Sequence, residues 1–263
     1  MWRLFRFLLQ CARQRLFGIS HGLAAFGAAC LIIWSQSAGA QTPVELELVL
    51  AIDSSTSVDA QEYWLQKQGL TLAFQHPDVQ NAIRAIGPNG IAVSLVQWAG
   101  KGAQVTSVDW VHVSDATEAG NLAAKIDATV RQVSGFTDIG GAIDFSTRSL
   151  DSNSFLGRRR TIDVSGDGTS SVGDPGFARD RALAKNITIN GLVILNFEYD
   201  LGDLASLELI RHYNTSVAGG DAAFVLVASD FDDFARAIRE KLVREILGSV
   251  FSQSQLMRLA RVR

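Results

Sequence analysis

Residues 44–52 constrain the fold more than any other part of the chain, because their pattern changes along the segment. The segment begins with alternating apolar and acidic residues and ends as an uninterrupted apolar run over 48–52. A continuous apolar run of this length is typical of a strand that is buried on both faces of a parallel sheet. Residues 44–52 therefore predict a strand inside an α/β protein.

Short apolar segments and amphipathic helices alternate over the rest of the chain. Strands are predicted at 90–98, 106–113, 161–164, 187–195 and 223–227, and helices at 59–75, 175–185, 204–213 and 231–247. Another helix is predicted to begin after Thr137. One more is predicted to begin near Ser114, with an inner face made of Leu122, Ile126, Val130 and Val133. This order predicts a doubly wound, mostly parallel sheet with helices on both faces and an antiparallel edge strand at 106–113.

The first forty residues have the organisation of a secretory signal peptide. Four arginines and no acidic residue precede a short apolar core at 23–34, and Ala38-Gly39-Ala40 supplies small residues for cleavage. The core is shorter than the roughly 20 residues of an ordinary membrane span. We therefore expect export to the periplasm or the medium, with membrane attachment only if residues 1–40 stay uncleaved as an anchor.

Loss of the signal peptide would change the composition of the chain. Both cysteines, Cys11 and Cys30, lie in it, so the rest of the chain would be stable without a disulfide. Cleavage would leave 20 basic and 27 acidic residues, a net charge of −7. Such a charge is atypical of nucleic-acid-binding proteins. We expect one domain at 41–250, followed by a basic tail at 251–263.

Oxygen-bearing side chains occur where predicted strands end. Asp53, Ser55 and Ser57 follow the first strand, Thr137 lies in a glycine-flanked loop before a helix, and Asp167 follows the strand at 161–164. Ligands bind at the carboxyl edge of open α/β sheets. Oxygen ligands of this kind suit Mg²⁺, Mn²⁺ or Ca²⁺ better than zinc or copper. A simpler interpretation of the first segment is a turn that caps the next helix, because Asp59-Ala60-Gln61-Glu62 has the pattern of a capping box.

Together these residues resemble the von Willebrand factor type A (vWA) domain and its metal-ion-dependent adhesion site (MIDAS). The family signature is Asp-x-Ser-x-Ser after the first strand, a Thr in a Gly-rich loop, and an Asp-Gly turn after the fourth strand. Asp53, Ser55, Ser57, Thr137 and Asp167 match it in order, and the resemblance covers about 44–247. The segment 159–168 also resembles a group of exported bacterial proteins that consist of one vWA domain and have no assigned function. The chain departs from the family pattern at Ser165-Gly166, where an apolar residue and Thr are more common.

The resemblance implies a Rossmann-like vWA fold and a role for each site residue. Ser55 and Ser57 would coordinate Mg²⁺ through their hydroxyls, Asp53 and Asp167 would act mainly through water or hydrogen bonds, and Thr137 would enter or leave the coordination sphere. The cation would keep most of its charge and accept an Asp or Glu from a protein partner. The resemblance thus implies a binding module and not an enzyme.

The residues also allow a test of two other function classes, a hydrolase and a structural subunit. A Mg²⁺-dependent hydrolase of the phosphatase type would use Asp53 as its nucleophile, but that chemistry typically needs a second acid two residues later, where Ser55 stands. No Ser-His-acid or Cys-His arrangement is visible. A structural subunit that has lost metal dependence is the third class, and the intact five-residue set disfavours it. Asp163 is unusual within an apolar strand, and we expect it to pair with an arginine or a backbone amide.

Overall fold

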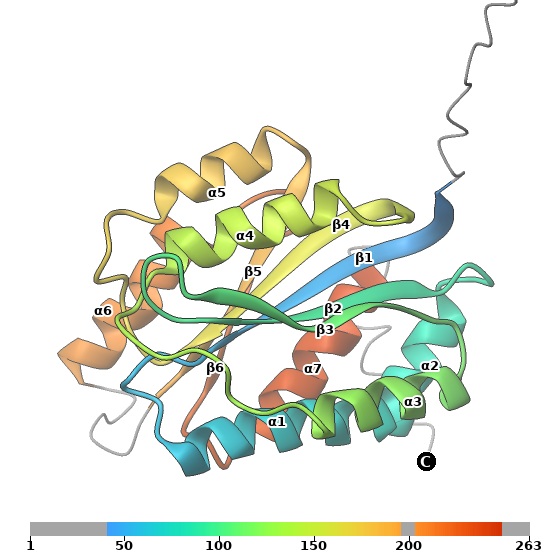
Figure 1. The fold of residues 1–263 in the computed structure, drawn as a ribbon, viewed down its shortest axis with the longest axis horizontal. Helices are drawn as coiled ribbons and strands as arrows, with labels where there is room; N and C mark the ends of the chain where they lie inside the picture. Colours follow the sequence, from blue (N-terminus) through green and yellow to red (C-terminus); the bar gives the residue numbers. More distant parts are fainter. Residues whose placement is uncertain (1–40, 196–202, 249–263) are drawn as a thin grey trace, which may run out of the picture. The chain divides into compact units, whose positions relative to one another are not determined.

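The computed structural model describes residues 41–195 and 203–248, and these contain one six-stranded sheet (Figure 1). The strand order is β3-β2-β1-β4-β5-β6, and every neighbouring pair is parallel except β2 and β3. This arrangement confirms the predicted doubly wound sheet and its antiparallel edge strand. The strands are β1 (Thr42–Asp53), β2 (Ile91–Trp98), β3 (Gln104–Val113), β4 (Phe155–Gly166), β5 (Ile187–Ile194) and β6 (Val225–Ala228).

Helices cover both faces of the sheet (Figure 1). One face carries α1 (Ala60–Gln75), α2 (Pro77–Ala85), α3 (Ala116–Asp127) and α7 (Phe234–Leu247), and the other carries α4 (Ile139–Asp151), α5 (Gly176–Leu183) and α6 (Leu204–His212). The central strand β1 contributes to both cores, because Leu48 and Leu50 pack among α1 and α7 while Val49 and Ala51 pack toward α4 and α5. The continuous apolar run of β1 thus reflects burial on two faces.

The capping box predicted from the sequence begins α1. The Asp59 carboxylate accepts hydrogen bonds from the N–H groups of Gln61 and Glu62, and the Glu62 carboxylate accepts one from the Asp59 N–H. These bonds satisfy backbone donors that have no partner within the helix. Because Asp59 caps α1, the carboxylate of Asp53 and the hydroxyls of Ser55 and Ser57 are not needed as helix caps and can serve another role.

Two helices differ from the prediction. Helix α2, which was not predicted, follows α1 directly because Pro77 occupies its first turn and the His76 ring accepts a hydrogen bond from the Asp78 N–H at 3.1 Å. Helix α3 ends at Asp127, so the inner face predicted to include Val130 and Val133 is wrong beyond Ile126. The side chain of Val130 is 68% exposed. Beyond the helix, the Val130 carbonyl accepts a 2.8 Å hydrogen bond from the Gln97 side chain of β2.

The predicted signal peptide at 1–40 and basic tail at 251–263 lie outside the described residues and stay predictions. None of the helices within 41–195 and 203–248 combines the length and the apolar character that a membrane crossing requires.

Candidate metal site

The two acidic residues of the predicted site lie at the ends of neighbouring strands. Strands β1 and β4 pair in parallel with Ile52 opposite Ser165, so Asp53 ends β1 beside the point where Asp167 follows β4. Both aspartates are buried. The sheet therefore brings together two carboxylates that are 114 positions apart in the sequence.

Ser55 and Ser57 connect these carboxylates through a chain of hydrogen bonds. The Ser55 N–H donates to Asp53 Oδ1 at 2.7 Å, the Ser55 and Ser57 hydroxyl oxygens lie 3.0 Å apart, and the Ser57 hydroxyl donates to Asp167 Oδ1 at 2.9 Å. Four of the five predicted residues thus form one connected cluster. The alternate spacing of Asp53, Ser55 and Ser57 places all three on the same side of the turn after β1.

Thr137 approaches the cluster from the loop before α4. Its N–H donates to the Ser171 hydroxyl at 3.0 Å, and its carbonyl accepts from the Ser171 N–H at 2.8 Å. A Cβ atom built on Gly168 would lie 4.0 Å from the Thr137 hydroxyl oxygen, which puts that side chain beside the Asp167-Gly168 turn. Among the described residues the Thr137 hydroxyl makes no direct hydrogen bond to the other four predicted residues.

Arg131 fixes the turn after β1 to the loop that carries Thr137. Its Nη2 atom donates to the carbonyls of Ser54 and Ser55 at 2.8 and 2.7 Å. In the same region, the N–H and the hydroxyl of Thr56 both donate to the Gly135 carbonyl, at 2.9 and 3.1 Å. The sequence analysis did not predict a role for Arg131. The one feature that could have indicated it is that Arg131 is the single cation in the polar segment between α3 and Thr137.

Close packing around Gly166 explains why this position departs from the family pattern. A Cβ atom at that position would lie 2.6 Å from the Tyr213 hydroxyl and 2.9 Å from Asp53 Oδ2, distances that real Cβ atoms do not reach. Tyr213 belongs to a short π-helix, η1 (Tyr213–Val217), and is fully buried. Glycine is therefore the residue that lets β4 pass between the tyrosine ring and Asp53.

Several buried polar atoms of the site have no hydrogen-bond partner within the described part of the chain. They include Asp53 Oδ2, the Tyr213 hydroxyl and Trp98 Nε1. Burial raises the pKa of Asp53 to about 7, and the charge of Asp167 adds to this increase. Burial also raises the pKa of Asp167, although the hydrogen bond from Ser57 opposes the shift. Two poorly solvated carboxylates at one place favour the binding of a positive charge.

The chemistry of these donors fits a hard divalent cation. All of them are oxygens, from two carboxylates and the hydroxyls of Ser55, Ser57 and Thr137, as Mg²⁺ and Ca²⁺ prefer. Within residues 41–195 and 203–248, no group of three or more His, Cys, Asp or Glu side chains is placed to hold a metal ion. The candidate site is thus rich in neutral hydroxyls, unlike an acidic cage.

The comparisons agree with this geometry. A family model described as "Protein of unknown function (DUF1194)" matches residues 43–250. A search of the curated proteins gives no match. Similar solved structures include proximal thread matrix protein 1 from the mussel byssus with a zinc-occupied MIDAS motif, which has a TM-score of 0.51 and 16% identity over 78% of this chain and 46% of that one.

Two bacterial pilus proteins have the same fold. The pilus adhesin SpaC from Lactobacillus rhamnosus GG in its open conformation matches with a TM-score of 0.55 and 12% identity over 78% of this chain and 30% of that one. The vWF domain of the type V pili tip protein Mfa5 from Porphyromonas gingivalis matches with a TM-score of 0.50 and 12% identity over 80% of this chain and 98% of that one. This chain spans less than half of the mussel protein and of SpaC. The chain belongs to the DUF1194 family, and its domain has the vWA fold.

Proposed function

We propose that this protein is an exported adhesion module that binds an acidic side chain of a protein partner through a divalent cation. The observation that carries the proposal is the connected cluster of Asp53, Ser55, Ser57 and Asp167 at the carboxyl edge of the sheet, next to Thr137. The zinc-occupied MIDAS motif of the mussel protein and the adhesins among the similar structures support it.

The division of roles follows from the burial and contacts of each residue. Ser57 is exposed and Ser55 lies directly behind it, so their hydroxyls would hold Mg²⁺, or Mn²⁺ or Ca²⁺ in its place. Asp53 is fully buried and would act through hydrogen bonds to the ligands, as it already does to the Ser55 N–H. A bound cation would supply a positive charge that neutral hydroxyls leave largely uncompensated, which favours an incoming carboxylate.

The same contacts disfavour the hydrolase alternative. A nucleophilic Asp53 would need its carboxylate open to substrate, whereas Oδ1 accepts from Ser55 and Oδ2 is buried against Gly166 and Tyr213. Position 55 also carries a hydroxyl where a second acid would be required. We therefore propose a binding function without turnover.

The test uses the chain from Gln41 onward, immobilised in Mg²⁺ and exposed to the exported proteins of its source. A partner that elutes with chelator, and that the Ser55→Ala variant does not capture, is the expected result. Ser54→Ala is the matched control, because the Ser54 hydroxyl is buried in the same turn without a hydrogen-bond partner in the described structure. Capture that survives chelator would refute the metal mechanism. Hydrolysis of p-nitrophenyl phosphate that Asp53→Asn abolishes would establish the enzyme instead.

A further inference from the structure

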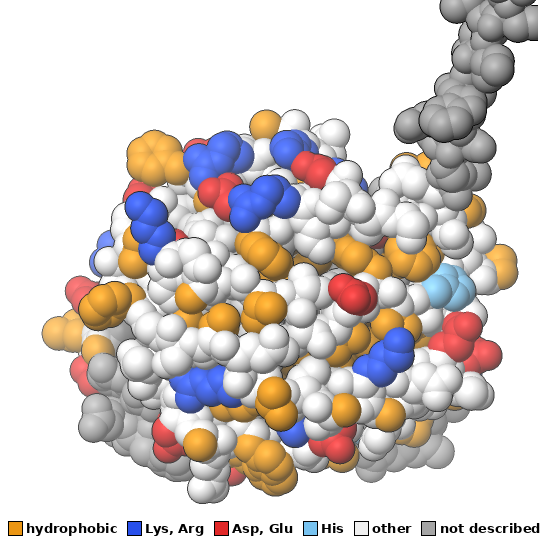
Figure 2. Space-filling model, in the orientation of Figure 1, with side chains coloured by type: hydrophobic (Ala, Val, Ile, Leu, Met, Phe, Trp, Pro, Cys, Tyr) orange, Lys and Arg blue, Asp and Glu red, His pale blue; other side chains and the backbone are white. Residues whose placement is uncertain are grey.

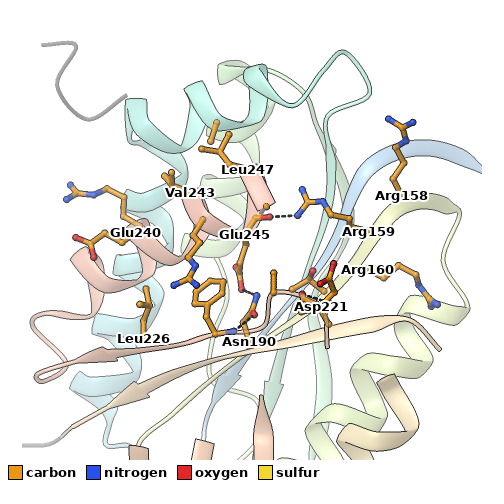
Figure 3. A pocket seen from close by; sticks show the side chains of 18 of the residues that line it. Arg158, Arg159, Arg160, Asn190, Asp221, Leu226, Glu240, Val243, Glu245 and Leu247 are labelled. Carbon is orange, nitrogen blue, oxygen red and sulfur yellow. Dashed lines mark hydrogen bonds between the residues drawn. The ribbon is translucent and has the colours of Figure 1, made fainter. Parts of the chain in front are cut away.

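A second candidate binding site lies at the opposite end of the strands from Asp53 and Asp167. The described residues surround a cavity of about 810 Å³ between α7 and the amino-terminal parts of β4, β5 and β6, with α2 at one side (Figure 3). Pockets that bind small molecules have volumes of roughly 300–1,000 Å³. The cavity is therefore large enough for an organic ligand.

One wall of this cavity is apolar. Phe224 and Leu226 line it from the β6 side, and Val243 and Leu247 line it from α7. Leu226 and Val243 are only partly buried where they pack against the main core, so both still present apolar surface to the cavity. A ligand with an apolar body would remove this surface from water, at about 25 cal/mol for each Å² covered.

Two arginines beside this wall are held in place by neutral groups. The Arg244 guanidinium carbon lies 3.8 Å from the centroid of the Phe224 ring, so the guanidinium lies over the ring face. Arg159 reaches from β4 to the end of α7, where its Nη1 donates to the Glu245 carbonyl at 2.6 Å and its Nη2 donates to the Ile246 carbonyl (Figure 3). Within the described residues, neither arginine has a carboxylate at salt-bridge distance.

Most other charges around the cavity are already paired. Arg158 pairs with Glu45, Arg160 pairs with Asp151, and in Figure 3 both side chains point away from α7. Among the acids, Glu240 pairs with Arg236 and Glu245 pairs with Lys241. Among the described residues, Arg159 and Arg244 therefore remain beside the apolar wall without a paired carboxylate. The opposing charges in the lining include Asp221 and Glu245, and Glu245 shares Lys241 with the buried Asp163. Arg239, whose guanidinium contacts the His76 ring, adds a further positive charge to the lining.

We propose that this cavity binds a small carboxylate with an apolar body. The planar guanidinium of Arg244, fixed on Phe224, presents its N–H groups in the geometry that pairs with both oxygens of a carboxylate. The apolar body lies against Leu226 and Val243. Arg159 adds positive charge from the other side without leaving the carbonyls at the end of α7.

Calorimetry with 2-naphthoate as the probe tests this site, and 2-naphthamide serves as its uncharged counterpart. The chain from Gln41 is used in metal-free buffer, so the carboxylate cannot bind through a cation at Ser55 and Ser57. We expect naphthoate to bind at least tenfold more tightly than naphthamide. Arg244→Gln should remove that difference, because Arg244 is exposed and its replacement leaves the core intact. Arg148→Gln, at an exposed arginine of α4 outside the cavity lining, should behave like the unaltered chain.

Val243→Trp provides a second test that changes no charge. The indole would fill the apolar part of the cavity and should abolish naphthoate binding. Equal affinity for naphthoate and naphthamide, or naphthoate binding that survives both Arg244→Gln and Val243→Trp, would overturn the proposal. Binding that appears only after removal of residues 249–263 would also overturn it, because the chain's own segment would then be the occupant.

Discussion

Asp53 ends β1 and Asp167 follows the neighbouring parallel strand β4, and burial together with the negative charge of Asp167 raises the pKa of Asp53. The two side chains belong to one network, because the hydroxyls of Ser55 and Ser57 lie between them. A cation bound there would relieve the repulsion between the carboxylates, and so would a proton on Asp53. A metal ion and a proton would therefore compete for the same site.

Metal binding should weaken as the pH falls below about 7. The pKa of Asp53 is about 7, so acidification protonates this carboxylate and reduces the negative charge that favours the cation. Calorimetric titration with Mn²⁺ should show a loss of affinity of up to about tenfold for each pH unit between 7 and 5. In Asp53→Asn the affinity should be low and should vary little over this range. A steep pH dependence that persists in Asp53→Asn would assign the titration to another group.

Ser55→Ala should lower Mg²⁺ affinity at least tenfold, because it deletes a hydroxyl from the predicted coordination sphere and the link between the Asp53 turn and Ser57. Ser54→Ala, one position earlier, should bind Mg²⁺ like the unaltered chain. Both variants should unfold cooperatively without metal, since neither serine belongs to the two hydrophobic cores. Calorimetry and urea denaturation measure these quantities. Equal losses of affinity in the two variants would indicate damage to the turn and not the loss of a ligand.

Gly166→Ala should destabilise the domain by about 2–4 kcal/mol, because the new methyl group would clash with the Tyr213 hydroxyl and Asp53 Oδ2. Tyr213→Phe removes the nearer of these contacts. The double variant should therefore be more stable than the sum of the two single changes predicts, by about 1 kcal/mol. Urea denaturation of all four proteins measures this coupling. Additive changes would show that the tyrosine hydroxyl does not restrict position 166.

The succession of strands and helices along the chain and the first segment of the candidate site could be predicted from the sequence because these signals are local. The apolar run of β1 reports burial on two faces, and Asp53, Ser55 and Ser57 are close in sequence as well as in space. Arg131 contacts Ser54 and Ser55 from more than 75 positions away in the sequence, so no local sequence pattern indicates these contacts. The end of α3 was missed for a related reason. Val130 continues the helical spacing, but the loop must leave the helix to reach the site.

The partner of Asp163 is a second contact that could not be predicted from the sequence. Its expected partner was an arginine or a backbone amide, and this expectation was wrong. The partner is Lys241 of α7, whose Nζ lies 2.6 Å from Asp163 Oδ1 and 2.6 Å from Glu245 Oε1. All three side chains are buried. A lysine on an otherwise amphipathic helix gives no sign in the sequence that it enters the core, because its partner lies 78 positions earlier.

Lys241→Met should destabilise the domain by about 3–5 kcal/mol, because it leaves Asp163 and Glu245 buried together without their cation. The effect should depend on pH. Burial and the charge of Asp163 raise the pKa of Glu245, so the folded state holds a proton at a pH where the unfolded state has released it. Stability from this group is therefore present at low pH and is lost as the pH rises through the raised pKa. Without Lys241, which opposes this shift, the loss should be larger.

Urea denaturation of the unaltered chain, Lys241→Met and Lys241→Met/Glu245→Gln between pH 5 and 8 separates these contributions. The single variant should lose stability more steeply with rising pH than the unaltered chain. Glu245→Gln should reduce that slope, because it removes one of the two carboxyl groups but keeps a hydrogen-bonding side chain beside Asn190. Lys67→Met is the control, since the Lys67 ion pair with Asp127 is partly exposed and contributes at most about 1 kcal/mol. A Lys241→Met variant with the stability and pH dependence of Lys67→Met would show that the buried cation is not required to balance the two acids.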